Sequence, residues 1–233
     1  MCNIQISRRF PMRVFFLVIL SGFITLFPGR SQIKQEISSG AGGLFLFGDI
    51  GTMGAGLLAH GSWGFFPSDD FKILAGINAA WISGSDEGSR NKDRDLAYST
   101  VLIEPVVQVQ FFYWKWWGPG YSRRGLVLKE PVLSAYISAG FSPVWFSPSP
   151  RRSLEDSFED NFPHVTVSVP IGIGVRYVMS GNWVLGWNAE VRMPATDYLD
   201  GYTSVHSRAN DVYYGTSIHL IYRLPSPARK AMR

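Results

Sequence analysis

Cysteine is almost absent from this chain of 233 residues, with Cys2 as its only example. This scarcity excludes a disulfide scaffold and a cysteine-rich metal site. Charged residues are also few, at 17% of the chain, whereas 46% of the residues are hydrophobic and 15% are aromatic. A disordered chain would combine low hydrophobicity with a high net charge, so this composition indicates a folded protein. The length predicts one domain.

A surplus of basic residues is missing from most of the chain, although the formal net charge is +4. Residues 1–31 contain four of the 22 Lys and Arg residues and no Asp or Glu, so the remainder has 18 residues of each sign. Domains that bind nucleic acid usually carry a basic surface. No nucleic-acid partner is therefore predicted.

The first 31 residues have the pattern of a secretory signal peptide. Residues 8–13 carry three arginines, and residues 14–27 are the apolar stretch VFFLVILSGFITLF. This stretch is shorter than the roughly 20 residues that span a bilayer as a helix. We predict a signal peptide over 1–31, cleaved after Ser31, and hence export. The alternative is an uncleaved anchor helix.

Beyond residue 32, alternation of apolar and polar residues takes the place of a second long apolar run. In segment 183–193 the odd positions are Trp, Leu, Trp, Ala, Val and Met, while the even positions include Gly, Asn, Glu and Arg. A period of two is the pattern of a β-strand with one apolar face. Recurring alternation predicts eight strands, at residues 36–47, 57–66, 71–82, 100–113, 133–142, 167–177, 183–193 and 212–224.

The connections between these segments alternate in length. Tight turns are predicted at 67–70 and 178–182, and the first connection, 48–56, is intermediate. Long polar connections are predicted at 83–99, 143–166 and 194–211. Short turns at one end and long loops at the other are typical of outer-membrane barrels. The link 114–131 departs from this pattern, because it is long yet falls on the short-turn side.

Aromatic residues gather near the ends of the predicted strands, as they do in the interfacial girdles of membrane barrels. The short-turn side has Phe65, Phe66, Phe71, Tyr113, Trp114, Trp116, Trp117, Tyr177, Trp183 and Tyr222. The long-loop side has Trp81, Trp145, Phe146, Tyr213 and Tyr214.

The two faces of the strands differ in bulk as well as in polarity. The large apolar side chains suit contact with lipid, and the small or polar ones suit a narrow lumen. We therefore expect an all-β fold, an eight-stranded antiparallel transmembrane β-barrel of the outer-membrane type over residues 32–224. A short basic tail follows at 225–233, and both termini are expected in the periplasm. The alternative is a soluble β-sandwich with a Trp-rich core.

Charged residues on the predicted lumen face need partners, because an unpaired buried charge costs several kcal/mol. An eight-stranded barrel is only wide enough for its own side chains. We therefore predict an interior network of salt bridges, a structural role for these residues and no conducting pore. The residues concerned are Lys72, Glu104, Arg176, Glu190, Arg192 and Arg223.

Catalytic motifs are scarce. The four histidines lack the spacings of common metal sites, and no G-x-S-x-G motif is present. We expect no catalytic residues, metal, cofactor or small-molecule substrate. One alternative remains, a lipid hydrolase with a Ser/His/Asp site in the 194–211 loop, drawn from Asp200, Ser204, His206, Ser207 and Asp211.

Basic and aromatic residues mark the link 114–131. The predicted partner-binding set is Lys115, Trp116, Trp117, Arg123, Arg124 and Lys129. Solvated loop charge and a docking surface are both open interpretations of this set.

Several short motifs together carry a resemblance to a known family. They include Gly48-Asp49-Ile50 after the first strand, residues 170–175 (PIGIGV), Asn182-Trp183 and the ending Tyr222-Arg223-Leu224. The most specific motif is Thr196-Asp197-Tyr198-Leu199-Asp200. Over most of residues 36–224 the chain resembles the PorG-like family of outer-membrane β-barrels from Bacteroidetes. It departs from that family in its proline-containing tail, in the Trp-rich segment 114–117 and in ending on Leu224 where Phe is frequent.

The resemblance implies a component of the type IX secretion system. PorG-like barrels there associate with the periplasmic ring of the lipoprotein PorK and PorN, so the resemblance implies these two partners. The family also includes barrels without a known role. On the secretion interpretation, the link 114–131 is the expected contact with the ring.

Overall fold

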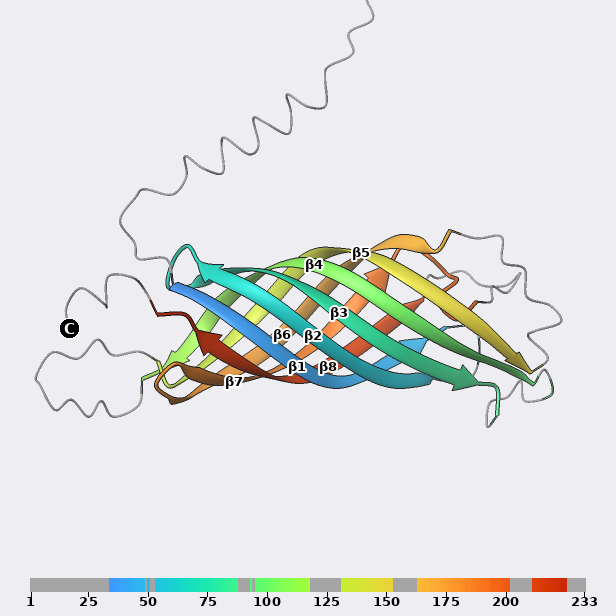
Figure 1. Cartoon of the computed structure of the whole chain (residues 1–233), viewed down its shortest axis with the longest axis horizontal. Coiled ribbons are helices and arrows are strands. Elements are labelled where there is room, and N and C mark those ends of the chain that lie inside the picture. Colours follow the sequence, from blue (N-terminus) through green and yellow to red (C-terminus); the bar gives the residue numbers. More distant parts are fainter. Residues whose placement is uncertain are drawn as a thin grey trace, which may run out of the picture. The chain divides into compact units, whose positions relative to one another are not determined.

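The computed structural model describes residues 34–48, 50, 53–87, 93, 95–117, 131–152, 163–201 and 211–225. The predicted signal peptide and all but the first residue of the predicted tail lie outside this set. Strands in the described part form one closed antiparallel barrel, in which each pairs with the next along the chain and the last pairs with the first (Figure 1). They are β1 (Lys34–Phe47), β2 (Gly54–Phe66), β3 (Phe71–Ser85), β4 (Leu96–Trp116), β5 (Leu133–Arg152), β6 (Val165–Ser180), β7 (Trp183–Pro194) and β8 (Val212–Arg223).

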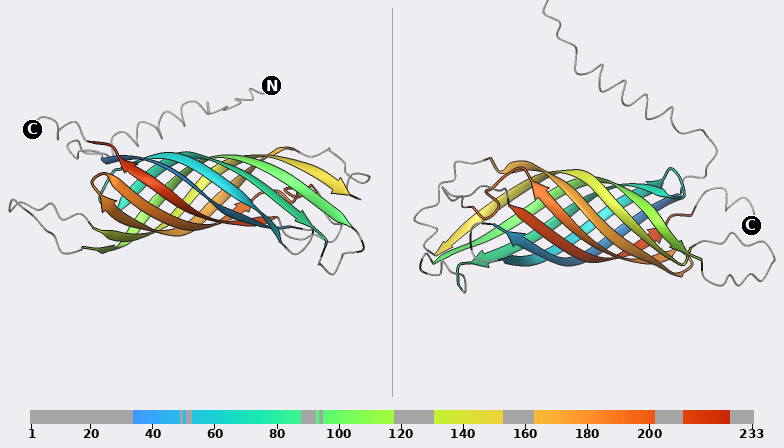
Figure 2. Two further views of the ribbon diagram at one scale, coloured as in Figure 1. Left: turned by 60° about the horizontal axis from the view of Figure 1, so that its bottom comes forward. Right: turned by 180° about the vertical axis from the view of Figure 1, so that it is seen from behind.

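Closure removes the free sheet edges that hydrocarbon cannot hydrogen-bond. The strands wind obliquely around the barrel wall in every view (Figure 2). The prediction of an eight-stranded antiparallel barrel is confirmed, and the soluble β-sandwich is wrong. Among the residues that the structure describes, no helix has the length and apolar character to cross a membrane.

The wall extends further toward the long-loop end than predicted. The expected loop 143–166 is wrong in its first part, because β5 continues to Arg152 and pairs with β4 from Leu96 onward. The loop was predicted from the polar residues of this stretch, which also contains prolines, and prolines are tolerated at a sheet edge. Beyond residue 146, β5 has β4 alone as a ladder partner among the described strands, so Pro148 and Pro150 lie on such an edge.

A β-bulge changes the direction of side chains near the other end of β4. The register with β5 shifts between Phe111 and Trp114, which adds a residue to β4. Tyr113 and Trp114 both become exposed, although they are neighbours in sequence. The predicted link 114–131 therefore begins too early, because Lys115 and Trp116 still belong to β4. Two adjacent aromatic side chains on the outer face strengthen the girdle at this end.

Large apolar side chains cover the outside of the barrel. Ile173 is 54% exposed in β6 and Leu57 is 70% exposed in β2, while Val, Ile, Leu and Trp residues are exposed along the other strands too. A soluble monomer rarely exposes a continuous apolar surface of this extent. The predicted orientation, with apolar side chains outward and ionised ones inward, is confirmed. The girdle prediction is wrong for three residues, Phe66, Phe146 and Tyr213, because their side chains point into the barrel.

The interior has two parts. The half near the short turns is polar, as predicted, but the half near the long loops is a hydrophobic core. This core arises because inward positions near that end are also apolar, and connecting segments fold in to cover them. Its members include Leu44, Leu46, Leu58, Ile82, Leu102, Val144, Phe146, Leu199 and Tyr213.

Candidate functional site

A cluster of cations surrounds Glu36 just inside the short-turn end, and we name it the Glu36 cluster. Lys72 Nζ lies 3.0 Å from Glu36 Oε2, and Arg176 Nη2 lies 2.5 Å from Glu36 Oε1. Arg223 Nε lies 3.5 Å from Oε1. Strand ends bring these groups together, since Glu36 is near the start of β1, Lys72 follows the β2–β3 turn and Arg223 ends β8. Three cations therefore share one buried carboxylate.

Aromatic rings pack against the same cations. The Arg176 guanidinium lies 5.5 Å from the centroid of the Phe66 ring and 5.3 Å from that of Phe112. Lys72 Nζ lies 5.8 Å from the Phe66 centroid. Cation–π attraction within about 6 Å stabilises a desolvated cation. The inward direction of Phe66 thus has a structural reason.

A second cluster lies deeper in the lumen, with Arg192 joining two carboxylates; we name it the Arg192 cluster. Arg192 Nη1 contacts Glu104 Oε2, and Nη2 donates to Glu190 Oε2 at 2.8 Å. The Tyr213 hydroxyl donates to Glu104 Oε1 at 3.0 Å. Gln108 Nε2 and the Asn188 amide donate to Glu190 Oε1 at 3.1 Å and 3.0 Å. Each buried charge in this cluster has an opposite partner.

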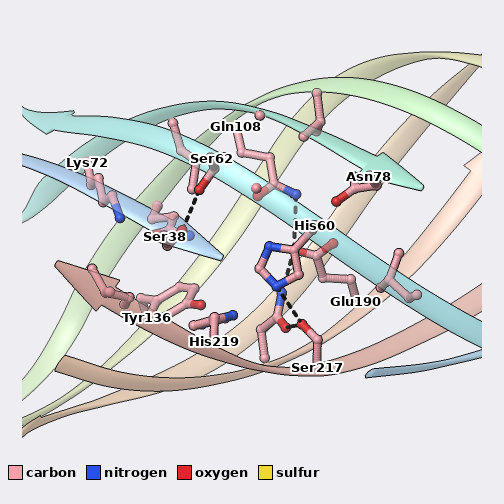
Figure 3. Close-up of a pocket in the computed structure, with 18 of the residues that line it drawn as sticks. Ser38, His60, Ser62, Lys72, Asn78, Gln108, Tyr136, Glu190, Ser217 and His219 are labelled. Carbon is pink, nitrogen blue, oxygen red and sulfur yellow. Dashed lines mark hydrogen bonds between the residues drawn. The ribbon is translucent and has the colours of Figure 1, made fainter. Parts of the chain in front are cut away.

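A small cavity of about 40 Å³ touches both clusters. Figure 3 shows Lys72 and Glu190 at opposite sides of it, with His60 between them. The rings of His60 and His219 meet edge to face at 5.3 Å, and Ser217 Oγ lies 3.3 Å from His60 Nε2. The cavity is large enough to hold ordered water. Side chains therefore occupy most of the polar half of the lumen.

The segment 196–201 folds into the long-loop end, and we name it the mouth segment. Leu199 is fully buried in the hydrophobic core. Its N–H donates to Asp211 Oδ2 at 2.8 Å, and its carbonyl accepts from Thr100 Oγ1 at 2.7 Å. Asp200 Oδ2 accepts from the N–H of Ile50 at 3.0 Å. These contacts hold the segment against three separate parts of the chain.

Close packing at this end requires one particular glycine. A Cβ placed on Gly48 would lie 2.7 Å from both Asp200 Oδ2 and Asp211 Oδ1. No larger residue fits there without moving a carboxylate that holds the mouth segment.

All six predicted lumen residues lie inside the barrel, distributed between the two clusters. Glu36 was not among the predicted lumen residues, although its place at the start of a predicted strand, on the polar face, pointed to the lumen. Tyr213 was not among them either, because an aromatic residue near a strand end is typical of the girdle. Side chains alternate between the two faces along 212–224. Because Gly215, Ser217 and His219 face inward, Tyr213 faces inward too.

The motif 196–200, on which the family resemblance rests, lies within the mouth segment. Tyr198 packs against the hydrophobic core, while Thr196 accepts a backbone hydrogen bond from Asp211 at 3.2 Å. Asp197 is partly buried. Asp49 lies outside the described residues. The motif therefore packs into the hydrophobic core through Leu199 and Tyr198.

Of the residues in the alternative Ser/His/Asp site, the structure describes the two aspartates. Asp200 and Asp211 are buried, and each accepts a hydrogen bond from a backbone N–H. Ser204, His206 and Ser207 lie outside the described residues. In the described part, no group of three or more His, Cys, Asp and Glu residues is arranged to hold a metal ion.

Only three of the six residues in the predicted partner-binding set, Lys115, Trp116 and Trp117, lie in the part of the chain that the structure describes. Lys115 Nζ donates to the Asp69 carbonyl at 2.7 Å and pairs with the Asp70 carboxylate, so it is held by the β2–β3 turn. Trp116 and Trp117 are exposed. Arg123, Arg124 and Lys129 lie outside the described residues.

Comparisons with known proteins show likeness in structure alone. No protein-family model and no curated protein matches the sequence. Among solved structures, the chain is similar to Neisserial surface protein A at 11% identity, over 84% of this chain and 100% of that one, with a TM-score of 0.44. It is similar to Ail of Yersinia pestis at 14% identity, over 83% and 100%, with a TM-score of 0.41. The outer membrane protein AlkL shares 11% identity, over 85% and 95%, with a TM-score of 0.44.

The closed strand order and the apolar exterior of the chain itself determine its class. It is an eight-stranded β-barrel of the outer-membrane type.

Proposed function

We propose that this protein is a non-enzymatic outer-membrane barrel that links periplasmic machinery of the type IX secretion system to the membrane. The observation that supports the proposal is the filled lumen. Ion-pair clusters occupy one half, a hydrophobic core occupies the other, and the mouth segment packs into that core. A lumen filled in this way leaves the ends of the barrel as the surfaces where a partner binds.

The end of β4 is the proposed contact with the ring proteins PorK and PorN. Lys115 is held by the turn at Asp69 and Asp70, which fixes the direction of the last residues of β4. Trp116 and Trp117 are exposed directly before the link that carries Arg123 and Arg124. Aromatic and Arg side chains are enriched at protein interfaces. This end therefore has the residue types that suit a docking surface, and the family resemblance supplies the identity of the partners.

Charge reversal in the link tests this role. The double variant Arg123→Glu/Arg124→Glu is expressed in the native host, and the ring proteins are recovered with the barrel from solubilised outer membranes. We expect recovery to fall roughly fivefold or more, since like charges across an interface are strongly unfavourable. The matched control is Lys34→Glu, which reverses an exposed charge at the same end of the barrel. Unchanged recovery with the double variant contradicts the proposal.

The non-enzymatic part of the proposal has its own test. His206→Ala removes the base of the alternative Ser/His/Asp site, and lipid A from wild-type and variant cells is compared by mass spectrometry. We expect identical lipid A profiles. A deacylated species that disappears in the variant would establish the lipid hydrolase instead.

A further inference from the structure

Three prolines lie in the interior of neighbouring strands of the wall. They are Pro105 in β4, Pro143 in β5 and Pro170 in β6. Proline has no backbone N–H, so within a sheet it removes a ladder hydrogen bond and is usually confined to edge strands and bulges. Each of these three strands has a neighbour on both sides in the closed barrel. The prolines therefore interrupt ladders inside the wall.

Two of these prolines face each other across the boundary between β4 and β5, which run side by side along the wall (Figure 1). The register is the same on both sides of this point, and it places Pro105 opposite Pro143. Among the described residues, the ladder is interrupted at 104–106 of β4 and 142–144 of β5. Both proline side chains are exposed on the outer face. The interruption therefore lies in the part of the wall that faces lipid.

The directions of the backbone groups show which hydrogen bonds are lost. The N–H of Phe146 points toward β6, since it donates to the His164 carbonyl at 2.9 Å. Backbone groups point alternately to the two sides of a strand, so those of Pro143 point toward β4. With N–H groups, Pro105 and Pro143 would exchange two hydrogen bonds. Both bonds are missing, and both carbonyls lose their ladder donor.

Pro170 interrupts the ladder on the other side of β5. The register places it opposite Gly140, and residues 140–141 have no ladder pair among the described residues of β6. The segment 140–144, which we name the β5 centre, thus lacks part of its ladder toward both neighbours. The other six ladders of the described wall run through the middle of the barrel without interruption.

Ser142 supplies a hydrogen-bond donor at this point. Its hydroxyl donates to the Pro105 carbonyl at 2.7 Å, and its Oγ lies 3.3 Å from the carbonyl oxygen of Pro143. The side chain is fully buried on the inner face. A backbone carbonyl without a donor is strongly unfavourable in hydrocarbon, because no water reaches it there. One hydroxyl group therefore takes the place of two missing N–H groups.

We propose that the β5 centre is the segment at which the barrel wall opens first, and that the Ser142 hydroxyl keeps it closed. Local opening requires the least free energy where the fewest hydrogen bonds are broken. Intact ladders between β4 and β5 continue on both sides of the interruption, so the opening is local and leaves the barrel folded. The inference is independent of the secretion role, because it concerns the wall alone.

Amide hydrogen exchange, measured by NMR on the refolded barrel, tests the proposal. The reference is segment 75–79 of β3, which lies beside Pro105 and has uninterrupted ladders to both neighbours in the described wall. We expect amides of the β5 centre to exchange roughly tenfold faster than those of the reference, or more. Equal rates in the two segments overturn the proposal.

Replacement of the hydroxyl tests the role of Ser142. We expect Ser142→Ala to accelerate exchange in the β5 centre by a further factor of roughly ten, because the two proline carbonyls lose their donor. The matched control is Ser138→Ala, which changes another buried inward serine of β5 outside the interruption. The control should leave exchange in the β5 centre within about twofold of the wild-type rate. Equal effects of the two variants overturn the role of Ser142.

Restoring the missing N–H groups gives the opposite test. The double variant Pro105→Val/Pro143→Val can form the two absent ladder bonds, and we expect it to slow exchange in the β5 centre to within about threefold of the β3 reference. An unchanged rate overturns the proposal. If Ser142→Ala does not fold, the wild-type comparison and this double variant still decide.

Discussion

The carboxylate of Asp200 accepts a hydrogen bond from the backbone N–H of Ile50, at 3.0 Å and across 150 residues of sequence. This bond connects the mouth segment to the β1–β2 connection. Both residues are buried at the long-loop end, beside the hydrophobic core. Closure of this end of the lumen therefore depends on side chains from the loops as well as on the strands.

Removing that carboxylate should loosen the long-loop end. We expect Asp200→Ala to lower the free energy of unfolding by about 1–3 kcal/mol, because the N–H of Ile50 is left buried without an acceptor. Urea unfolding in lipid vesicles, followed by tryptophan fluorescence, measures the change. The control is Asp69→Ala, at an exposed turn, where the change should be much smaller. Equal effects of the two variants would mean that the mouth segment contributes little to stability.

Arg192 should be the most sensitive residue of the Arg192 cluster. Arg192→Met leaves Glu104 and Glu190 facing each other without their shared cation, and we expect a loss of about 3–5 kcal/mol. Glu104→Gln keeps a hydrogen-bonding group and still leaves Arg192 paired with Glu190, so its cost should be smaller. The same unfolding assay compares the two, and a larger cost for Glu104→Gln would contradict this account of the cluster.

The free-energy cost of adding a charge to the outer face should depend on how deep the residue lies in the bilayer. Ile173 lies near the middle of β6 and Met179 lies next to its end, and both are exposed. We expect Ile173→Arg to cost about 2–4 kcal/mol in a bilayer and Met179→Arg about 0–1 kcal/mol, because burial of a cation in hydrocarbon is most costly at the midplane. Folding titrations into vesicles measure both. Similar small costs at the two positions would indicate that this face does not meet lipid.

The direction of insertion is checked by labelling with a membrane-impermeant maleimide. Ser68 lies in the β2–β3 turn and Glu87 follows β3 at the other end, and both are exposed. With the termini in the periplasm, Glu87→Cys should be labelled on intact cells, while Ser68→Cys should be labelled only after the outer membrane is permeabilised. The native Cys2 lies in the predicted signal peptide and does not interfere once that peptide is removed. The reverse pattern would place the termini outside.

Much of the barrel was predictable because its signal is local. A period of two in 183–193 or 167–177 reports which face of a strand meets lipid, and neither the partner strand nor the register is needed to see it. The six charged lumen residues followed from the same alternation. The continuation of β5 through Pro148 was not predictable, because proline is tolerated only where a ladder partner is missing, and that depends on where β6 begins.

The chain by itself determined that the strands form a narrow barrel with an apolar outer face and ionised residues inside, since alternation is a property of single segments. Only the tertiary structure decided which charges meet. Glu36, Lys72, Arg176 and Arg223 come from four strands, and the register of the closed sheet brings them within contact distance. The tertiary structure also decided that Leu199 and Asp200 are buried at the long-loop end of the barrel. The physical reason is that a buried charge or a buried loop is stabilised by partners distant in sequence, which no local pattern contains.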